Sequence, residues 1–280
     1  MYRNILATVN EFTNSEISAR YAIALARSCR AELTFLFVSK DALDANALRH
    51  AEAALGRLFS EAEASGVAAR SVLESGDPVE KITGWVKNNE VDITFAGTRR
   101  EDVERRFFVT ALARELMLKL PCSVAMVRAV HLGKTHPRHI LVPLGGRARD
   151  IEERTFFAAK LAEAFGSKVT LIHMPKPMSR FLHGEVRLKP AERDGLIPGD
   201  ISEYVSTLNR YDVPHDKATA HGHVGRTINI EAAVRRNDLI VMGASQRSLL
   251  SRLVRGNPVE DVLRDTPCNL IVFRPGHEHT

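Results

Sequence analysis

The chain repeats itself, and this internal repeat limits the folds that it can adopt. The repeat is visible in three pairs of segments: "VDITFAGTRR" at 91–100 with "NDLIVMGASQ" at 237–246, "LPCSVAMVR" at 120–128 with "TPCNLIVFR" at 266–274, and "RNILATVN" at 3–10 with "RHILVPLG" at 138–145. Repeats of this length predict two domains of one fold, at 1–129 and 137–276. The short polar segment 129–137 between them is expected to be a linker.

The two halves differ in length by an insert in the second one. The first pair of segments above is offset by 146 residues and the last pair by only 135, so the second half carries about eleven extra residues. We place them in "PKPMSRFLHGEVRLKPAERDGLIPGD" at 175–200, which is rich in proline and glycine and has no counterpart in the first half. This insert covers a pocket, contacts a partner or is a surface loop.

Within each half, short apolar runs alternate with helical patterns. "NILATV" at 4–9 and "DLIVMG" at 238–243 are short, mostly apolar runs, which is typical of strands buried on both faces of a sheet. Asp77 before Pro78, and Asn257 before Pro258, are typical helix starts. Strands that alternate with helices predict an α/β fold, with a parallel sheet covered on both sides in each half.

The composition is that of a globular chain in a reducing compartment. Of the 280 residues, 44% are hydrophobic and 26% are charged, and no apolar run is long enough to span a membrane. The N-terminus enters a strand pattern at once, without a secretory signal. The three cysteines form no metal-binding or CxxC spacing, so we expect free thiols and a cytoplasmic location. A net charge of +5 and 6% aromatic residues do not support nucleic-acid binding.

One loop has the pattern of a phosphate site. In "GASQRSLLSRLVRGN" at 243–257, Gly243 follows a strand, and Gly256 and Asn257 precede a helix. Free N–H groups at a helix N-terminus favour an anion, and the loop holds arginines but no acidic residue. The alternative is that the glycines serve only to leave a strand and start a helix, and that the arginines are solvated. Pro258 also removes one N–H from that helix end.

At this point the chain resembles a known family. The arrangement of strand, glycine, loop, glycine, helix, "PC" and strand occurs twice, and it is similar to tandem universal stress proteins, as is "GDP" at 76–78. The resemblance implies two tandem doubly wound domains of the adenine nucleotide alpha hydrolase-like type, each a five-stranded parallel sheet flanked by about four helices. Nucleotide-binding members hold ATP along this loop, and members associate through their fifth strands.

The second half matches the family's binding motif in part. Gly243 and Gly256 fit the first and third glycines, whereas Gln246 replaces the second glycine and Asn257 the Ser or Thr. Gly145 stands where nucleotide-binding members have an Asp at the end of the first strand. The resemblance implies this ligand-binding set: Pro143, Met174, Met242, Gly243, Ala244, Gln246, Arg247, Gly256 and Asn257.

The first half departs further from the motif, and we expect it to bind no nucleotide. Only Gly97 remains there, and Arg100, Thr110, Ala111 and Asn10 hold the other motif positions.

The sequence gives less support to a metal site or a reactive cysteine. His173 and the "HGH" at 221–223 match no zinc signature, and Cys122 and Cys268 are expected to be small buried side chains. No catalytic or metal site can be assembled from these residues.

The expected function is therefore that of a cytoplasmic, non-catalytic stress-response protein whose second domain binds ATP or another adenine nucleotide. The alternative is a pure protein-interaction scaffold that has lost nucleotide binding, and slow ATP hydrolysis is a third hypothesis. An unknown protein is the expected partner, with neither nucleic acid nor membrane. The two halves are expected to pair with each other, and a homodimer is a further option.

Overall fold

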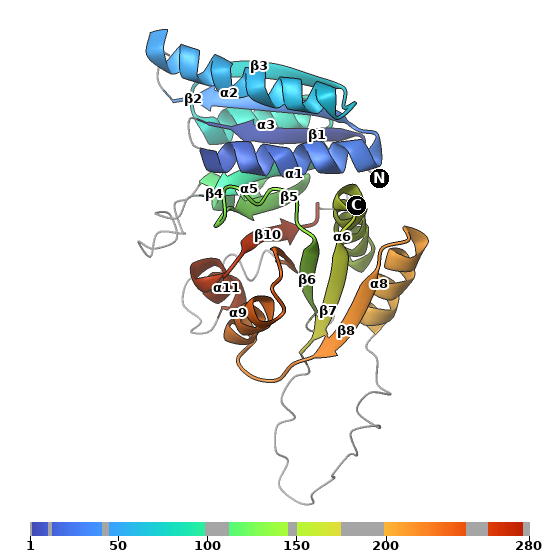
Figure 1. Cartoon of the computed structure of the whole chain (residues 1–280). Coiled ribbons are helices and arrows are strands. Elements are labelled where there is room, and N and C mark those ends of the chain that lie inside the picture. Colours follow the sequence, from blue (N-terminus) through green and yellow to red (C-terminus); the bar gives the residue numbers. More distant parts are fainter. Residues whose placement is uncertain are drawn as a thin grey trace, which may run out of the picture.

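The computed structural model describes residues 2–10, 13–40, 45–98, 112–144, 150–174, 199–244 and 257–276. Within them, each half contains five strands alternating with four helices (Figure 1). The first half contains β1 (Asn4–Val9), α1 (Thr13–Cys29), β2 (Glu32–Ser39), α2 (Ala45–Ala64), β3 (Ala69–Ser75), α3 (Pro78–Asn88), β4 (Ile93–Thr98), α5 (Leu112–Lys119) and β5 (Ser123–Arg128). The second contains β6 (His139–Leu144), α6 (Ile151–Phe165), β7 (Lys168–His173), α8 (Gly199–Arg210), β8 (His215–Thr219), α9 (Val224–Val234), β9 (Leu239–Gly243), α11 (Pro258–Asp265) and β10 (Asn269–Arg274).

A single ten-stranded sheet runs through both halves in the order β3-β2-β1-β4-β5-β10-β9-β6-β7-β8. Neighbouring strands are parallel except β5 and β10, which pair antiparallel with Val127 opposite Ile271. The prediction of a five-stranded parallel sheet in each half is confirmed, and so is the pairing of the two halves through their fifth strands. In Figure 1 the two halves lie one above the other, joined at β5 and β10.

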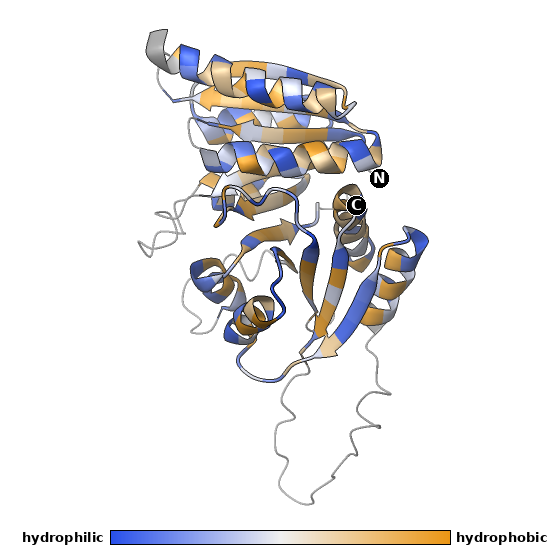
Figure 2. Ribbon diagram, in the orientation of Figure 1, coloured by the Kyte–Doolittle hydropathy of each residue, from blue (hydrophilic) through white to orange (hydrophobic). Residues whose placement is uncertain are grey.

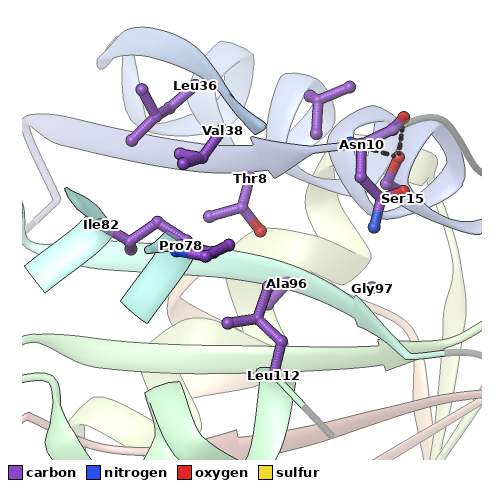
Figure 3. Close-up of a pocket in the computed structure, with 11 residues that line it drawn as sticks. Thr8, Asn10, Ser15, Leu36, Val38, Pro78, Ile82, Ala96, Gly97 and Leu112 are labelled. Atoms are coloured by element: carbon purple, nitrogen blue, oxygen red, sulfur yellow. Dashed lines mark hydrogen bonds between the residues drawn. The ribbon is translucent and has the colours of Figure 1, made fainter. Parts of the chain in front are cut away.

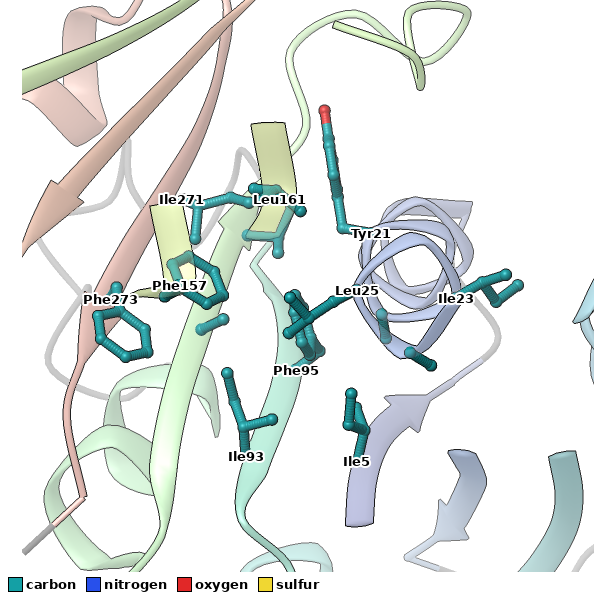
Figure 4. Close-up of a cluster of buried hydrophobic side chains, with 14 of the residues drawn as sticks. Ile5, Tyr21, Ile23, Leu25, Ile93, Phe95, Phe157, Leu161, Ile271 and Phe273 are labelled. Atoms are coloured by element: carbon teal, nitrogen blue, oxygen red, sulfur yellow. The ribbon is translucent and has the colours of Figure 1, made fainter. Parts of the chain in front are cut away.

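Helices of both halves cover each face of this sheet. On one face, α1, α2, α6 and α8 enclose a core that includes Phe95, Phe157 and Phe273 (Figure 4). On the other face, α3, α5, α9 and α11 enclose a second core that includes Ile82 and Val262. Figure 2 shows hydrophilic and hydrophobic residues alternating along the helices in front of the sheet, as expected for helices with one buried side. Because each core contains residues of both halves, the halves form one packed body.

The helix starts predicted from Asp-Pro and Asn-Pro pairs are confirmed. Asp77 accepts hydrogen bonds from the backbone N–H groups of Val79 and Glu80, each at 3.0 Å, and Pro78 begins α3. Asn257 accepts one from Val259 N at 3.1 Å, and Pro258 begins α11. These caps satisfy N–H groups that the first turn of a helix leaves without partners.

A buried amide ties the linker to both halves. The side chain of Asn269, at the start of β10, is fully buried. Its oxygen accepts hydrogen bonds from Val130 N at 2.8 Å and His131 N at 2.9 Å, and its nitrogen donates to Lys134 O at 3.0 Å and to the Tyr21 hydroxyl of α1 at 3.1 Å. The segment between the domains is therefore held by hydrogen bonds.

A half-buried carboxylate also lies between the halves. Glu153 of α6 accepts a hydrogen bond from the Tyr2 hydroxyl at 3.0 Å and another from the Ser123 hydroxyl of β5. Gly276 N donates to the same Ser123 oxygen at 2.6 Å. Burial raises the pKa of Glu153, although the hydrogen bonds from Ser123 and Tyr2 act in the opposite direction. The free-energy cost of removing this carboxylate from water therefore exceeds the stabilisation that its two hydroxyl donors provide.

This arrangement predicts how the stability of the chain depends on pH. Because the folded-state pKa of Glu153 is raised, its contribution is fully present below its unfolded pKa of about 4.3 and is lost as pH rises through the folded value. Glu153→Gln should therefore gain stability relative to the native chain as pH rises from about 4 to 7. Urea unfolding of both proteins across that range measures the difference. Glu152→Gln, at the exposed neighbouring position, controls for loss of charge. A difference that does not vary with pH would contradict the prediction.

Candidate functional site

The strand order places the candidate site at the carboxyl ends of β6, β7 and β9. From β6 the chain continues to β7 and β8 on one side of β6, and then crosses to β9 and β10 on its other side. Doubly wound sheets bind ligands at such a point, where the strand order reverses. Leu144 pairs with His173 at the ends of β6 and β7, and β9 ends at Gly243. Sequence reasoning and topology thus indicate the same edge of the second domain.

An arginine side chain lies against Gly243. A Cβ atom on this glycine would overlap Nη1 of Arg154 and lie 2.7 Å from its Cζ. The same guanidinium donates from Nη2 to the carbonyl oxygen of Ala244 at 2.8 Å. A glycine at the end of a strand has no side chain, so another group can approach its backbone closely. In the structure, the group that approaches is the guanidinium of Arg154 from the first turns of α6.

Asn257 begins the last helix on the same half of the molecule. Its side-chain oxygen accepts from Val259 N, and Pro258 supplies no N–H. Asp261 N donates to the backbone oxygen of Asn257 at 3.2 Å. Several donors of the helix N-terminus are therefore already used or missing. An anion at this end must draw on other donors as well.

Three of the residues implied by the resemblance lie in the hydrophobic core. Met174, Met242 and Ala244 are buried on the face covered by α9 and α11, together with Ile228. Pro143 is half-buried at the end of β6. Met174 N donates to Leu144 O at 3.3 Å, which fixes the chain where it leaves β7. These residues form the floor of the strand ends, and a role for them in ligand contact stays a prediction.

Part of the predicted site lies outside the described residues. Gln246, Arg247 and Gly256 fall in the segment 245–256, and Gly145 falls in 145–149. Most of the insert, 175–198, is also outside the described residues, and its last two positions already belong to α8. The geometry of the site therefore depends on Arg154, Gly243, Ala244 and Asn257.

The first domain closes the corresponding place with its own backbone. A Cβ atom on Gly97 would lie 2.9 Å from Asn14 O and 3.1 Å from Ser15 Cα, so this glycine permits close packing of α1. Ser15 accepts from Asn10 N at 3.0 Å. The cavity beside these residues, shown in Figure 3, has a volume of about 30 Å³. That is space for about one water molecule among the described residues, and the absence of nucleotide binding in this domain stays a prediction.

Histidines and cysteines form no second site in the part of the chain that the structure describes. There, no three His, Cys, Asp or Glu side chains gather closely enough to hold a metal ion. Cys122 and Cys268 are buried as predicted, and burial raises their thiol pKa values to about 11 and about 12. Cys29 is half-buried, and burial raises its pKa to about 11. These thiols are protonated at neutral pH and are poor nucleophiles.

Sequence reasoning missed Arg154. It lies in a segment with an ordinary amphipathic helical pattern, where an arginine is usually solvated. The two halves can be aligned at the ends of their first helices, and this alignment shows that position 154 differs between them. Ala31 N donates to Ala26 O, and Ser167 N makes the same bond to Ala162 O, both at 2.9 Å. This register aligns Arg154 with Ser18, a small buried residue. A long cation in place of a small buried residue marks a difference between the halves.

Comparisons with known proteins agree with this fold. No curated protein matches the chain. A universal stress protein from Archaeoglobus fulgidus is 16% identical, with a TM-score of 0.68, over 99% of this chain and 97% of that one. A universal stress protein assigned by similarity, from Pseudomonas aeruginosa UCBPP-PA14, is 17% identical, with a TM-score of 0.63, over 98% and 94%. An Arabidopsis thaliana family protein with AMP bound matches 45% of this chain and 90% of its own at 15% identity, with a TM-score of 0.35.

Of the helices that the structure describes, not one combines the length and apolar character that a bilayer crossing requires.

The model of the universal stress protein family matches residues 1–128 and again residues 137–274. These two matches cover most of the chain and coincide with its two five-stranded halves. The chain therefore belongs to the universal stress protein family and carries two of its domains in tandem.

Proposed function

We propose that this chain is a non-catalytic, cytoplasmic stress-response protein whose second domain binds an adenine nucleotide. One observation carries the proposal: at the ligand edge of that domain, a guanidinium lies against the glycine that ends β9. Doubly wound sheets bind ligands at this edge, and a guanidinium pairs well with phosphate. ATP or a related adenine nucleotide is the class of ligand that we assign to the site.

A second function has an observation in its favour. Arg154 itself fills the space against Gly243, and Met174 and Met242 are already buried beneath the strand ends. This packing supports a protein-interaction scaffold that no longer binds a nucleotide. Catalysis is not part of either proposal, because the loop 243–257 contains no carboxylate that could position Mg²⁺ or a water molecule.

Calorimetric titration of the purified full chain with ATP, ADP and AMP tests the first proposal. We expect binding to the native chain and a loss of about tenfold in affinity in Asn257→Asp. Aspartate caps a helix as well as asparagine does, so the fold is kept while a negative charge is added beside the phosphate. Asp77→Asn, the opposite exchange at the cap of α3 in the first domain, is the matched control and should leave binding unchanged.

The result that would contradict the proposal is a flat titration with all three nucleotides. Denaturing the purified protein and analysing the supernatant excludes a nucleotide that was bound already. If no nucleotide is released and none binds, the interaction scaffold becomes the better description of this chain.

A further inference from the structure

We infer that Arg154 is the residue that recognises the phosphate of the ligand, and that it makes the second domain select a phosphorylated adenine nucleotide over a nucleoside. The inference rests on the proposed function, because it assigns a chemical role within the same site. Arg154 belongs to no motif that the sequence presented. Its position at the strand ends is a property of the fold.

The first turn of α6 directs this side chain to the strand ends. Asp150 precedes the helix in a left-handed conformation, with φ 57°, and its carbonyl oxygen accepts from Arg154 N at 3.2 Å. The side chain then reaches the end of β9. There Nη1 lies against Gly243, and Nη2 bonds to Ala244 O. The guanidinium is thus held at a defined place beside the end of β9.

The glycine at 243 has a physical reason in this arrangement. Any side chain at that position would displace the guanidinium, because its Cβ atom would overlap Nη1 of Arg154. In the first domain, the matching Gly97 instead accommodates the backbone of Asn14 and Ser15. The same glycine therefore seats a cation in the second domain and a helix backbone in the first. This difference assigns anion binding to the second domain alone.

Burial and the neighbouring charges act on Arg154 in opposite directions. Burial lowers its pKa, and electrostatic interactions with Tyr204, Asp150 and Glu153 act in the opposite direction. Glu153 already accepts hydrogen bonds from Tyr2 and Ser123 at the domain interface. A partly buried guanidinium gains free energy when a phosphate approaches, because the pair combines opposite charge with hydrogen bonds in matching directions.

The test compares ligands with and without phosphate on the full chain. Adenosine, AMP and ATP are titrated by calorimetry into the native protein and into Arg154→Gln. We expect AMP to bind the native chain at least about tenfold more tightly than adenosine. In Arg154→Gln this preference should disappear, with adenosine affinity unchanged. Gly243→Ala should behave in the same way, because it displaces the guanidinium. Arg226→Gln, which removes an exposed arginine of α9, is the matched control.

A second measurement observes the guanidinium directly. In a ¹⁵N spectrum of arginine side chains, the Nε–Hε signal that is missing in Arg154→Gln should move when AMP is added and stay in place with adenosine. Thermal unfolding of each variant shows that the fold is kept.

Three results would overturn the inference, and they differ from one another. If Arg154→Gln binds both AMP and adenosine more tightly, Arg154 covers the site instead of binding phosphate. If the variant keeps the preference for AMP, the phosphate contact lies elsewhere and the proposed function stands without Arg154. If the native chain binds none of the three ligands, the proposed function itself fails, and the role of Arg154 fails with it.

Discussion

Replacing Phe157 by alanine is expected to lower the free energy of unfolding by about 3–5 kcal/mol. Phe157 lies on α6 and is fully buried between the two halves. Its ring stacks on Phe273 of β10 with centroids 4.3 Å apart and planes 6° apart, and its centroid is 6.2 Å from that of Phe95 in β4 of the first half (Figure 4). Alanine would leave a cavity at a position where helix, sheet and domain interface meet.

The measurement is urea unfolding followed by circular dichroism. Because both cores contain residues of both halves, we expect one cooperative transition for the native chain and one, at lower urea, for Phe157→Ala. Phe156→Ala removes the same volume from the next position, which is half-buried and edge-on to Tyr2 and Tyr211, and should cost less. Two separate transitions, with the substitution affecting only one of them, would show that the halves fold independently.

The fold was predictable because its signals are local and occur twice. Apolar runs marked the strands, and Asp77 and Asn257 marked helix starts that the structure confirms. The "PC" before each fifth strand pointed to matching positions in the two halves, where Cys122 and Cys268 are buried. The pairing of β5 with β10 was expected only from the family resemblance, and its antiparallel direction was not predicted, because nothing in "SVAMVR" or "NLIVFR" says which strand lies beside it.

The candidate site was predictable only in part, because the sequence does not show which groups a long side chain contacts in the folded protein. Gly243 could be placed at the end of a strand, but the group that lies against it, Arg154, comes from a helix much earlier in the chain. The burial of Arg274 was missed for the same reason. An arginine at the end of a strand is usually solvated, and here two of its three acceptors belong to the other half of the chain. Contacts of this kind follow from the assembled sheet.

Replacing Arg274 by methionine is expected to destabilise the chain by about 3 kcal/mol or more. Only 2% of Arg274 is exposed at the end of β10. Its guanidinium donates to Leu120 O and Cys122 O of the first half, each at 2.8 Å, and to Pro275 O at 2.7 Å. Methionine fills much of the same space but donates nothing, so three carbonyl oxygens would lose a donor. Burial lowers the pKa of Arg274, because removing the charged guanidinium from water is unfavourable. Methionine avoids this desolvation, which offsets part of the destabilisation caused by the lost hydrogen bonds.

Urea unfolding of Arg274→Met and Arg274→Lys measures this effect, with Arg264→Met as the control. Lysine keeps the charge but places one ammonium where a planar fork spans three acceptors, so its loss should be smaller than that of methionine. Arg264 lies on α11 with its side chain 59% exposed and makes only surface ion pairs, which contribute about 1 kcal/mol or less. If Arg274→Met costs no more than this control, the prediction is contradicted, and relief of desolvation or water at the three carbonyls must offset the lost hydrogen bonds. The coupling of the two domains would then depend on the β5–β10 ladder, the cores and the other hydrogen bonds between the halves, among them those of Asn269 and Glu153.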